Sequence, residues 1–333
     1  MVIKSNRKKT AVIFGIILCL TAMVFYVSLL VGKYPIAPKE VTGIFRGREM
    51  DEMAARVFFT LRFPRTIMAF LAGAGLSVAG SIYQNIFHNP LASPDLIGVS
   101  SGANAGAAFA IVCLHGGVAL AAGSAFAGGI LAVSLAVFLA GTAKRRSAAD
   151  FVLAGVAVKA LSDAFIMTMK YMADPERQLA SIDYWSMGSF AGMTADKLKV
   201  AGPLVIFAFM GLILLRWRIN LLTLSDDEAQ MLGVSVHINR IIVLGLTTLM
   251  VAASISVTGS ISFIGLIAPH IARMAFGKSD FITAVASGII GGFIILVSDI
   301  GARSFSASEI PVSIFTSLIG VPILLWLLSR KEA

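Results

Sequence analysis

The chain has 333 residues, of which 57% are hydrophobic and only 14% are charged, and its formal net charge is +9. Soluble proteins average about 25% charged residues, and several stretches here exceed the roughly 18 apolar residues that mark a membrane helix. The basic residues are scattered singly between apolar runs, without the clustered basic surface of nucleic-acid-binding proteins. The composition therefore predicts an all-α, polytopic membrane protein with one domain over residues 1–333, and it argues against nucleic acid as a partner.

Apolar segments follow one another along the whole chain. The basic start MVIKSNRKKT leads into a run with no small-x-small cleavage site after it, so we interpret the first segment as an uncleaved helix. Segment 263–276 is too short to cross a ~30 Å hydrocarbon layer upright and should be buried in protein. The ten predicted membrane helices are 11–32, 64–86, 94–114, 117–141, 148–172, 198–216, 235–258, 263–276, 281–303 and 310–329.

An even number of membrane helices places both chain termini on one side of the membrane. Lysine and arginine are enriched in cytoplasmic loops, and the stretches 6-NRKK-9 and 144-KRR-146 favour a cytoplasmic N-terminus. The bias is weak, because seven cations from Lys33 to Arg65 would then face outward and need a separate explanation. With this orientation both termini are cytoplasmic, and residues 217–234 form a cytoplasmic loop.

Small residues indicate how the helices meet. Glycines at every fourth position over 98–106, and again over 288–292, predict close helix contacts. Cys19 and Cys113 both fall within apolar runs and lack the spacing of a disulfide or a metal site, so we expect two small buried side chains.

Two pairs of opposite charges lie within or near predicted membrane helices. They are Lys159 with Asp163 and Asp299 with Arg303, each four residues apart. Ionisable groups at such positions suggest ion or proton pathways by default. The four-residue spacing places each pair on one helix face, so structural pairing is the favoured interpretation.

The stretch 222-LTLSDDEAQMLGV-234 places three adjacent acids in an otherwise apolar chain. Its serine and the glutamate three residues later have the form of a capping box, the acids suit the first turn of a helix, and the glycine suits its C-terminal cap. A helix of about seven residues, roughly 10 Å long, is marginal alone in water. It should therefore lie on its own bundle or dock into a cleft of a cytoplasmic partner.

A resemblance favours the second interpretation. The segment 217-WRINLLTLSDDEAQMLGV-234 resembles the coupling segment of the permease family of binding-protein-dependent ABC importers for iron–siderophores, haem and cobalamin. The family usually has Leu-Gly-Glu before the alanine, whereas Ser225 and Asp226 stand at the Gly-Glu positions here. Seven further blocks match the family in order: 61-LRFPRT-66, 79-AGSIYQNIFHNPLASPDLIGVSSGA-103, 153-LAGVA-157, 185-WSMGSF-190, 259-GSISFIGLIAPHIAR-273, 299-DIGAR-303 and 309-EIPVSIFTSLIGVP-322.

The resemblance implies roles for particular residues. The coupling segment would transmit motion from a cytoplasmic ATPase, and arginines at three external positions would dock acidic groups of a substrate-binding protein. Arginine suits this role because its planar fork matches a carboxylate. The implied coupling residues are Ser225, Asp226, Asp227, Glu228, Ala229, Met231, Leu232 and Gly233. The implied docking residues are Arg62, Arg65 and Arg303, and the implied cytoplasmic gate is Asn89, Pro90, Leu91, Ala148 and Ala149.

The resemblance also implies an assembly in a prokaryotic cytoplasmic membrane. Two permease copies, either a homodimer or a related heterodimer, would enclose a path lined by the second and fifth predicted helices and the start of the third. We expect this lining to be mostly apolar. The path would be served by two ATPase subunits inside and a binding protein outside. ATP and Mg²⁺ would be used by the partners, and this chain would bind no cofactor.

Other readings of the sequence are weaker. The tripeptide 277-GKS-279 lacks the upstream glycine and strand of a phosphate loop, and Ser100 in 98-GVSSG-102 lacks the strand-turn-helix setting of a hydrolase nucleophile. The four histidines have no metal-ligand spacing. An ion-coupled secondary transporter would show unpaired midplane acids and broken helices in related halves, and neither is clear. A ferric siderophore is the favoured cargo, with haem and cobalamin as alternatives.

Overall fold

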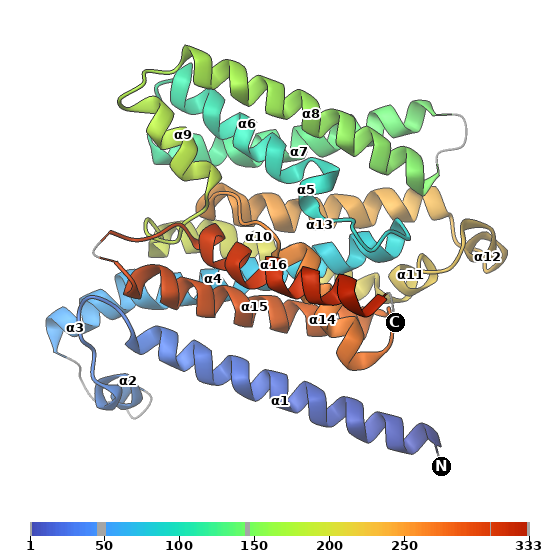
Figure 1. The fold of residues 1–333 in the computed structure, drawn as a ribbon, viewed down its shortest axis with the longest axis horizontal. Coiled ribbons are helices and arrows are strands. Elements are labelled where there is room, and N and C mark those ends of the chain that lie inside the picture. The colour runs from blue at the N-terminus through green and yellow to red at the C-terminus, as the bar shows by residue number, and fades with distance from the viewer. Residues whose placement is uncertain (1, 45–50, 144–146, 307, 332–333) are drawn as a thin grey trace.

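The computed structural model describes residues 2–44, 51–143, 147–306 and 308–331, and in this part of the chain the regular elements are all helical (Figure 1). The elements are α1 Val2–Leu30, α2 Pro38–Ile44, α3 Glu52–Val57, the π-helical turn η1 Phe58–Arg62, α4 Phe63–Ile86, α5 Pro94–Ile97, α6 Val99–Val112, α7 Val118–Thr142, α8 Ala148–Met172, α9 Gln178–Ser186, α10 Ala195–Leu214, α11 Arg216–Leu221, α12 Asp226–Met231, α13 Val236–Thr258, α14 Ile264–Phe276, α15 Phe281–Ser304 and α16 Val312–Lys331.

Each of the ten predicted apolar segments contains one long or medium helix. Among the described residues, seven helices are long and apolar enough to cross a membrane. The other three, α6, α14 and α16, are apolar with shorter qualifying stretches. The prediction of an all-α, polytopic membrane protein is confirmed.

The second predicted segment begins earlier than expected. Helical structure runs without a break from Glu52 to Ile86, starting at Asp51, whose carboxylate accepts hydrogen bonds from two backbone N–H groups of the first turn. Pro64 has no N–H to donate to the carbonyl four residues before it. The chain passes this point through η1, in which the N–H of Phe63 bonds to the carbonyl of Phe58.

The third predicted segment is broken by a glycine. Gly98 has φ +92°, a left-handed conformation that ends α5 and begins α6. The other glycines of the two predicted ridges do pack against neighbouring helices. A side chain at Gly106 would meet the carbonyl oxygen of Ser124 on α7 at 2.0 Å, and one at Gly292 would meet the ring of Phe70 on α4 at 2.4 Å.

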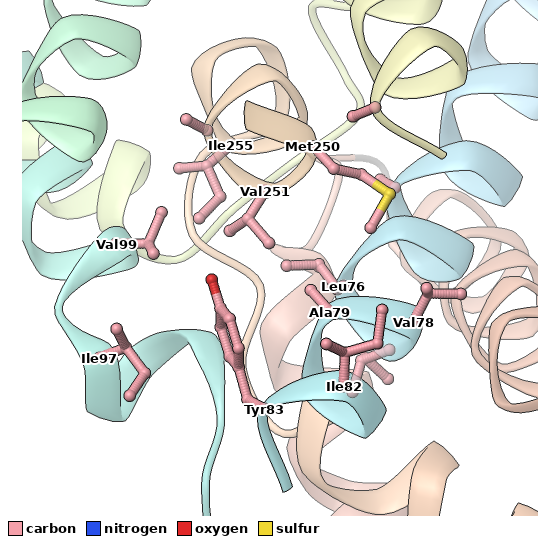
Figure 2. Close-up of a cluster of buried hydrophobic side chains, with 14 of the residues drawn as sticks. Leu76, Val78, Ala79, Ile82, Tyr83, Ile97, Val99, Met250, Val251 and Ile255 are labelled. Carbon is pink, nitrogen blue, oxygen red and sulfur yellow. The ribbon is translucent and has the colours of Figure 1, made fainter. Parts of the chain in front are cut away.

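Helix α4 lies at the centre of the bundle, with α13, α14 and α15 packed around it. Glycines allow this close approach: a side chain at Gly80 would lie 1.8 Å from the carbonyl oxygen of Gly265 on α14. Figure 2 shows side chains of α4, such as Leu76 and Tyr83, packed with Val251 and Ile255 of α13. This tight core gives a rigid frame on which both ends of the bundle are mounted.

Helix α1 begins and helix α16 ends near the end of the bundle that carries α12, while α2 and α3 lie at the opposite end (Figure 1). We refer to these as the α12 end and the α3 end. The expectation of buried thiols is wrong, because Cys19 and Cys113 are both free and exposed at the surface of the single chain. Apolar runs that face lipid need not bury their small residues.

Candidate functional site

The acidic stretch forms the predicted capped helix at the α12 end. The hydroxyl of Ser225 accepts from the N–H of Glu228, and the Glu228 carboxylate accepts from the N–H and hydroxyl of Ser225, at 3.0 and 2.8 Å. These hydrogen bonds hold the pKa of Glu228 below its ordinary value, and the bond from the Ser225 hydroxyl has a larger effect than the bond from its backbone N–H. Gly233 has φ +81°, as a C-terminal cap requires. The capping prediction is confirmed.

One face of α12 is anchored and the other is exposed. Ala229 is buried, at 1% exposure, whereas Met231 and Leu232 are 80% and 60% exposed. Asp227 and Glu228 are also exposed. The helix therefore lies on its own bundle through Ala229 and presents two large apolar side chains beside two acids to its surroundings.

Arg240 of α13 fixes the start of α12. Its guanidinium donates to both carboxylate oxygens of Asp226, at 2.7 and 3.5 Å, and its side chain is only 1% exposed. The same guanidinium lies 5.8 Å from the ring centre of Phe151 on α8. Arg240 therefore links the start of α12 to α13 and lies against α8.

Contacts continue from this anchor to both stretches of the expected gate. The ring of Phe151 lies 6.3 Å from that of Phe87, which follows the last residue of α4. A ring nitrogen of the next residue, His88, forms a hydrogen bond with the carbonyl oxygen of Thr223 at 3.3 Å. Thr223 lies two residues before Ser225, the N-cap of α12. The relay, which we define as Asp226, Arg240, Phe151 and Phe87, joins four elements at the α12 end.

The gate residues occupy a loop and a helix start. Asn89 caps the loop by accepting from the N–H of Leu91 at 2.9 Å, and Leu91 is 63% exposed. Ala148 and Ala149 are the first two residues of α8, just after the Ser147 cap. Phe87 lies two residues before Asn89, and Phe151 lies two residues after Ala149, so the contact between these two rings is close in sequence to both stretches. Their gating role stays a prediction.

The three predicted docking arginines lie at the α3 end. Arg65 donates to Asp299 at 2.8 Å and to Glu309 at 3.0 Å. Arg303 lies 3.4 Å from the other oxygen of Asp299, as its four-residue spacing indicated. Asp299 is fully buried. These side chains form an ionic cluster in which two arginines share one carboxylate.

Arg62 is held separately. Its guanidinium donates to the carbonyls of Leu29, at 3.1 Å, and of Leu30 and Tyr34. Arg303 also donates to the carbonyl and hydroxyl of Ser28. All three arginines are buried, at 5–8% exposure. They tie the end of α1 to α4 and α15, so docking would have to work through a mostly internal network, and it stays a prediction.

Sequence reasoning missed the residues that connect these sites. Arg240 is separated from Asp226 by 14 positions, and Glu309 from Arg65 by 244. The sequence signal for Arg240 was an isolated basic residue near the start of the predicted membrane helix 235–258. The signal for Glu309 was its place at the start of a family-like block.

The comparisons with known proteins agree with this geometry. The model of the FecCD transport family matches residues 20–330. The chain is 38% identical over 276 residues, 83% of each protein, to a Helicobacter pylori protein named "Probable iron chelatin transport system permease protein". It is 34% identical over 319 residues to the molybdate import system permease protein MolB of Haemophilus influenzae, covering 94% of this chain and 93% of MolB.

A solved structure shares the whole fold. It is an inward-facing conformation of an ABC transporter described as metal-chelate type, with TM-score 0.85 and 32% identity over 96% of this chain and 99% of that chain. The resemblance drawn from the ordered sequence blocks is therefore confirmed. Other relatives are named as a hemin transport permease of Yersinia pestis and a cobalamin import permease of Halobacterium salinarum, 36% and 33% identical over 83% and 85% of this chain. The chain belongs to the FecCD transport family and is the multi-pass membrane permease subunit, not itself catalytic, of a prokaryotic ABC importer, a class of transporter in which partner subunits use the ATP.

Proposed function

We propose that this permease carries a ferric siderophore or a similar metal chelate across the cytoplasmic membrane by ATP-driven alternating access. Two copies of the chain, or one copy and a related subunit, enclose the path. Both termini and α12 face the cytoplasm, where two ATPase subunits bind. The α3 end faces outward, where a substrate-binding protein delivers the cargo.

The observation that carries this proposal is the surface of α12. The side chains of Met231 and Leu232 are large, apolar and exposed, and α12 is too short to span a membrane. Acidic residues precede them in the first turn of the helix. Exposed apolar side chains on a short helix favour a protein partner that covers them. The buried Ala229 and the Asp226–Arg240 pair keep the helix rigid on the bundle. A gripped rigid element can bias a two-state bundle.

The relay supplies the path from α12 to the gate. When the ATPase subunits approach each other, the pull on α12 reaches α13 through Arg240 and α8 through Phe151. Phe87 then carries the movement to the loop of Asn89, Pro90 and Leu91. We propose that this loop and the start of α8, at Ala148 and Ala149, separate and close as the gate.

Docking of the binding protein is proposed at the α3 end. The cluster pairs Arg65 and Arg303 with Asp299 and Glu309, and Arg62, held separately on backbone carbonyls, brings the net charge of the five groups to +1. Glu309 is the more exposed of the two acids, at 23% of its side chain. An acidic group of the binding protein that displaces Glu309 from Arg65 would keep the guanidinium paired. In this exchange the cluster binds the partner, and the contacts of Arg65 change when the partner is bound.

Cargo identity is tested by competition. Membrane vesicles or cells that express the permease with its ATPase and binding protein should take up labelled ferric chelate in an ATP-dependent way. An excess of unlabelled ferric hydroxamate chelate should compete, and haem, cobalamin and molybdate should not. Competition by one of the latter alone would replace the cargo assignment, and uptake without any ATPase subunit would overturn the proposed function.

A further inference from the structure

Helix α8 carries ionic side chains where a membrane helix should be apolar. Lys159 lies near the midpoint of this 25-residue helix and contacts Asp163 at 2.6 Å. Their side chains are 41% and 39% exposed in the single chain. A pair sealed inside the bundle would be covered, and a pair facing lipid would be strongly unfavourable. The exposed parts of both side chains must therefore face something other than the protein core or the lipid.

The pair belongs to a longer polar stripe. Toward the α3 end, Lys170 contacts Asp183 of α9 at 2.6 Å, and both side chains are more than one third exposed. The two lysines are 11 residues apart, so the stripe extends for about 16 Å along the axis of α8. Toward the α12 end, α5 packs against α8, and a side chain at Gly98, which ends α5, would lie 3.6 Å from the backbone nitrogen of Lys159. The stripe thus runs from the α9 side toward the gate loop.

The remaining circumference of α8 is different. Leu161 is 62% exposed and lies two positions from both Lys159 and Asp163, which places it on the opposite side of the helix. Val156, at 43% exposure, lies three and seven positions before the same two residues and shares their face. One helix therefore shows an apolar surface suited to lipid and a charged surface suited to water.

We propose that Lys159 and Asp163 line a water-filled translocation path between two permease copies and contact a hydrophilic metal chelate as it passes. The inference rests on the proposed function, because a second chain must keep lipid away from the stripe. It also revises the expectation of a mostly apolar lining. In two copies, four charged groups would offer both donors and acceptors to a cargo with hydroxamate, carboxylate or amide oxygens, while the pairing within each copy limits how tightly the cargo is held.

Accessibility tests the placement. In the full importer with Cys19 and Cys113 replaced by serine, single cysteines are introduced as Val156→Cys and Leu161→Cys. A membrane-impermeant methanethiosulfonate reagent is added to both sides of proteoliposomes. The cysteine at 156 should react at least about tenfold faster than the one at 161, because thiolate chemistry requires water. Equal rates, or no reaction at 156, would overturn the placement.

Transport tests the contact. Lys159→Met with Asp163→Leu removes both charges together, which a structural pair tolerates. We expect uptake to fall about fivefold or more, as for a lost charged hydrogen bond, while ATPase stimulation by the binding protein is kept. Lys159→Arg with Asp163→Glu should restore uptake. Full uptake by the apolar variant would overturn the inference alone, whereas absence of ATP-dependent uptake in the parent complex would overturn the proposed function instead.

Discussion

Replacing Asp226 with asparagine tests how α12 is held on the bundle. The change keeps the shape of the side chain but removes the charge that faces the guanidinium of Arg240, which is only 1% exposed. Removing one partner of a buried ion pair costs about 3–5 kcal/mol. Because the Asp226 side chain is 38% exposed, solvent screening reduces this value to about 2 kcal/mol, or about thirtyfold in the population of the anchored helix.

The expected result is partial uncoupling. In proteoliposomes that contain the complete importer, Asp226→Asn should lower the amount of chelate transported per ATP hydrolysed, because ATPase closure then moves a loosened helix. The matched control is Asp227→Asn, since Asp227 is also in the first turn but is exposed. The double change Asp226→Asn with Arg240→Met should recover part of the stability, because no charge is then left buried. Wild-type coupling and stability in Asp226→Asn would refute the anchoring argument.

Three further outcomes are expected. Ala229→Pro removes the N–H that bonds to Ser225 at 3.0 Å and costs about 3 kcal/mol within α12, so hydrolysis should continue without uptake; normal uptake would count against a transmission helix. Arg65→Gln removes the closer of the two arginine partners of the fully buried Asp299 and leaves Arg303 at 3.4 Å, so the free energy of unfolding should fall by about 3 kcal/mol. The thermal unfolding temperature of the purified permease should then fall, and an unchanged temperature would contradict a structural role for the cluster. Glu309→Gln frees the charge of Arg65, so the binding protein should bind more tightly at low salt; unchanged affinity would contradict docking through this cluster.

The capped helix α12 could be predicted because its signals are local. A serine followed three positions later by a glutamate, three acids in the first turn and a glycine after the last turn all lie within nine residues. Its anchor could not be predicted in the same way. Arg240 reaches Asp226 only because α13 folds back beside α12, and an isolated arginine at a membrane helix end has several ordinary uses.

The same limit applies to the arginine cluster. Sequence reasoning placed Arg62, Arg65 and Arg303 at one end of the bundle and paired Arg303 with Asp299 through helix periodicity. The stronger partner of Asp299 is Arg65, 234 positions away, and no local pattern connects them. The short helices α2, α9 and α11 were also missed, because the prediction relied on long apolar runs and these helices are brief and partly polar.

Crosslinking from α12 tests whether this helix docks against the ATPase subunit. In the complete importer without native cysteines, a photoreactive thiol reagent is attached at Met231→Cys, which is 80% exposed, or at Phe305→Cys, which is 77% exposed beside the arginine cluster. We expect that position 231 crosslinks to the ATPase subunit, that the yield changes when ATP is bound, and that position 305 does not crosslink to it. Crosslinking of the ATPase at 305 but not at 231, or labelling of 231 from outside intact cells, would contradict cytoplasmic docking of α12.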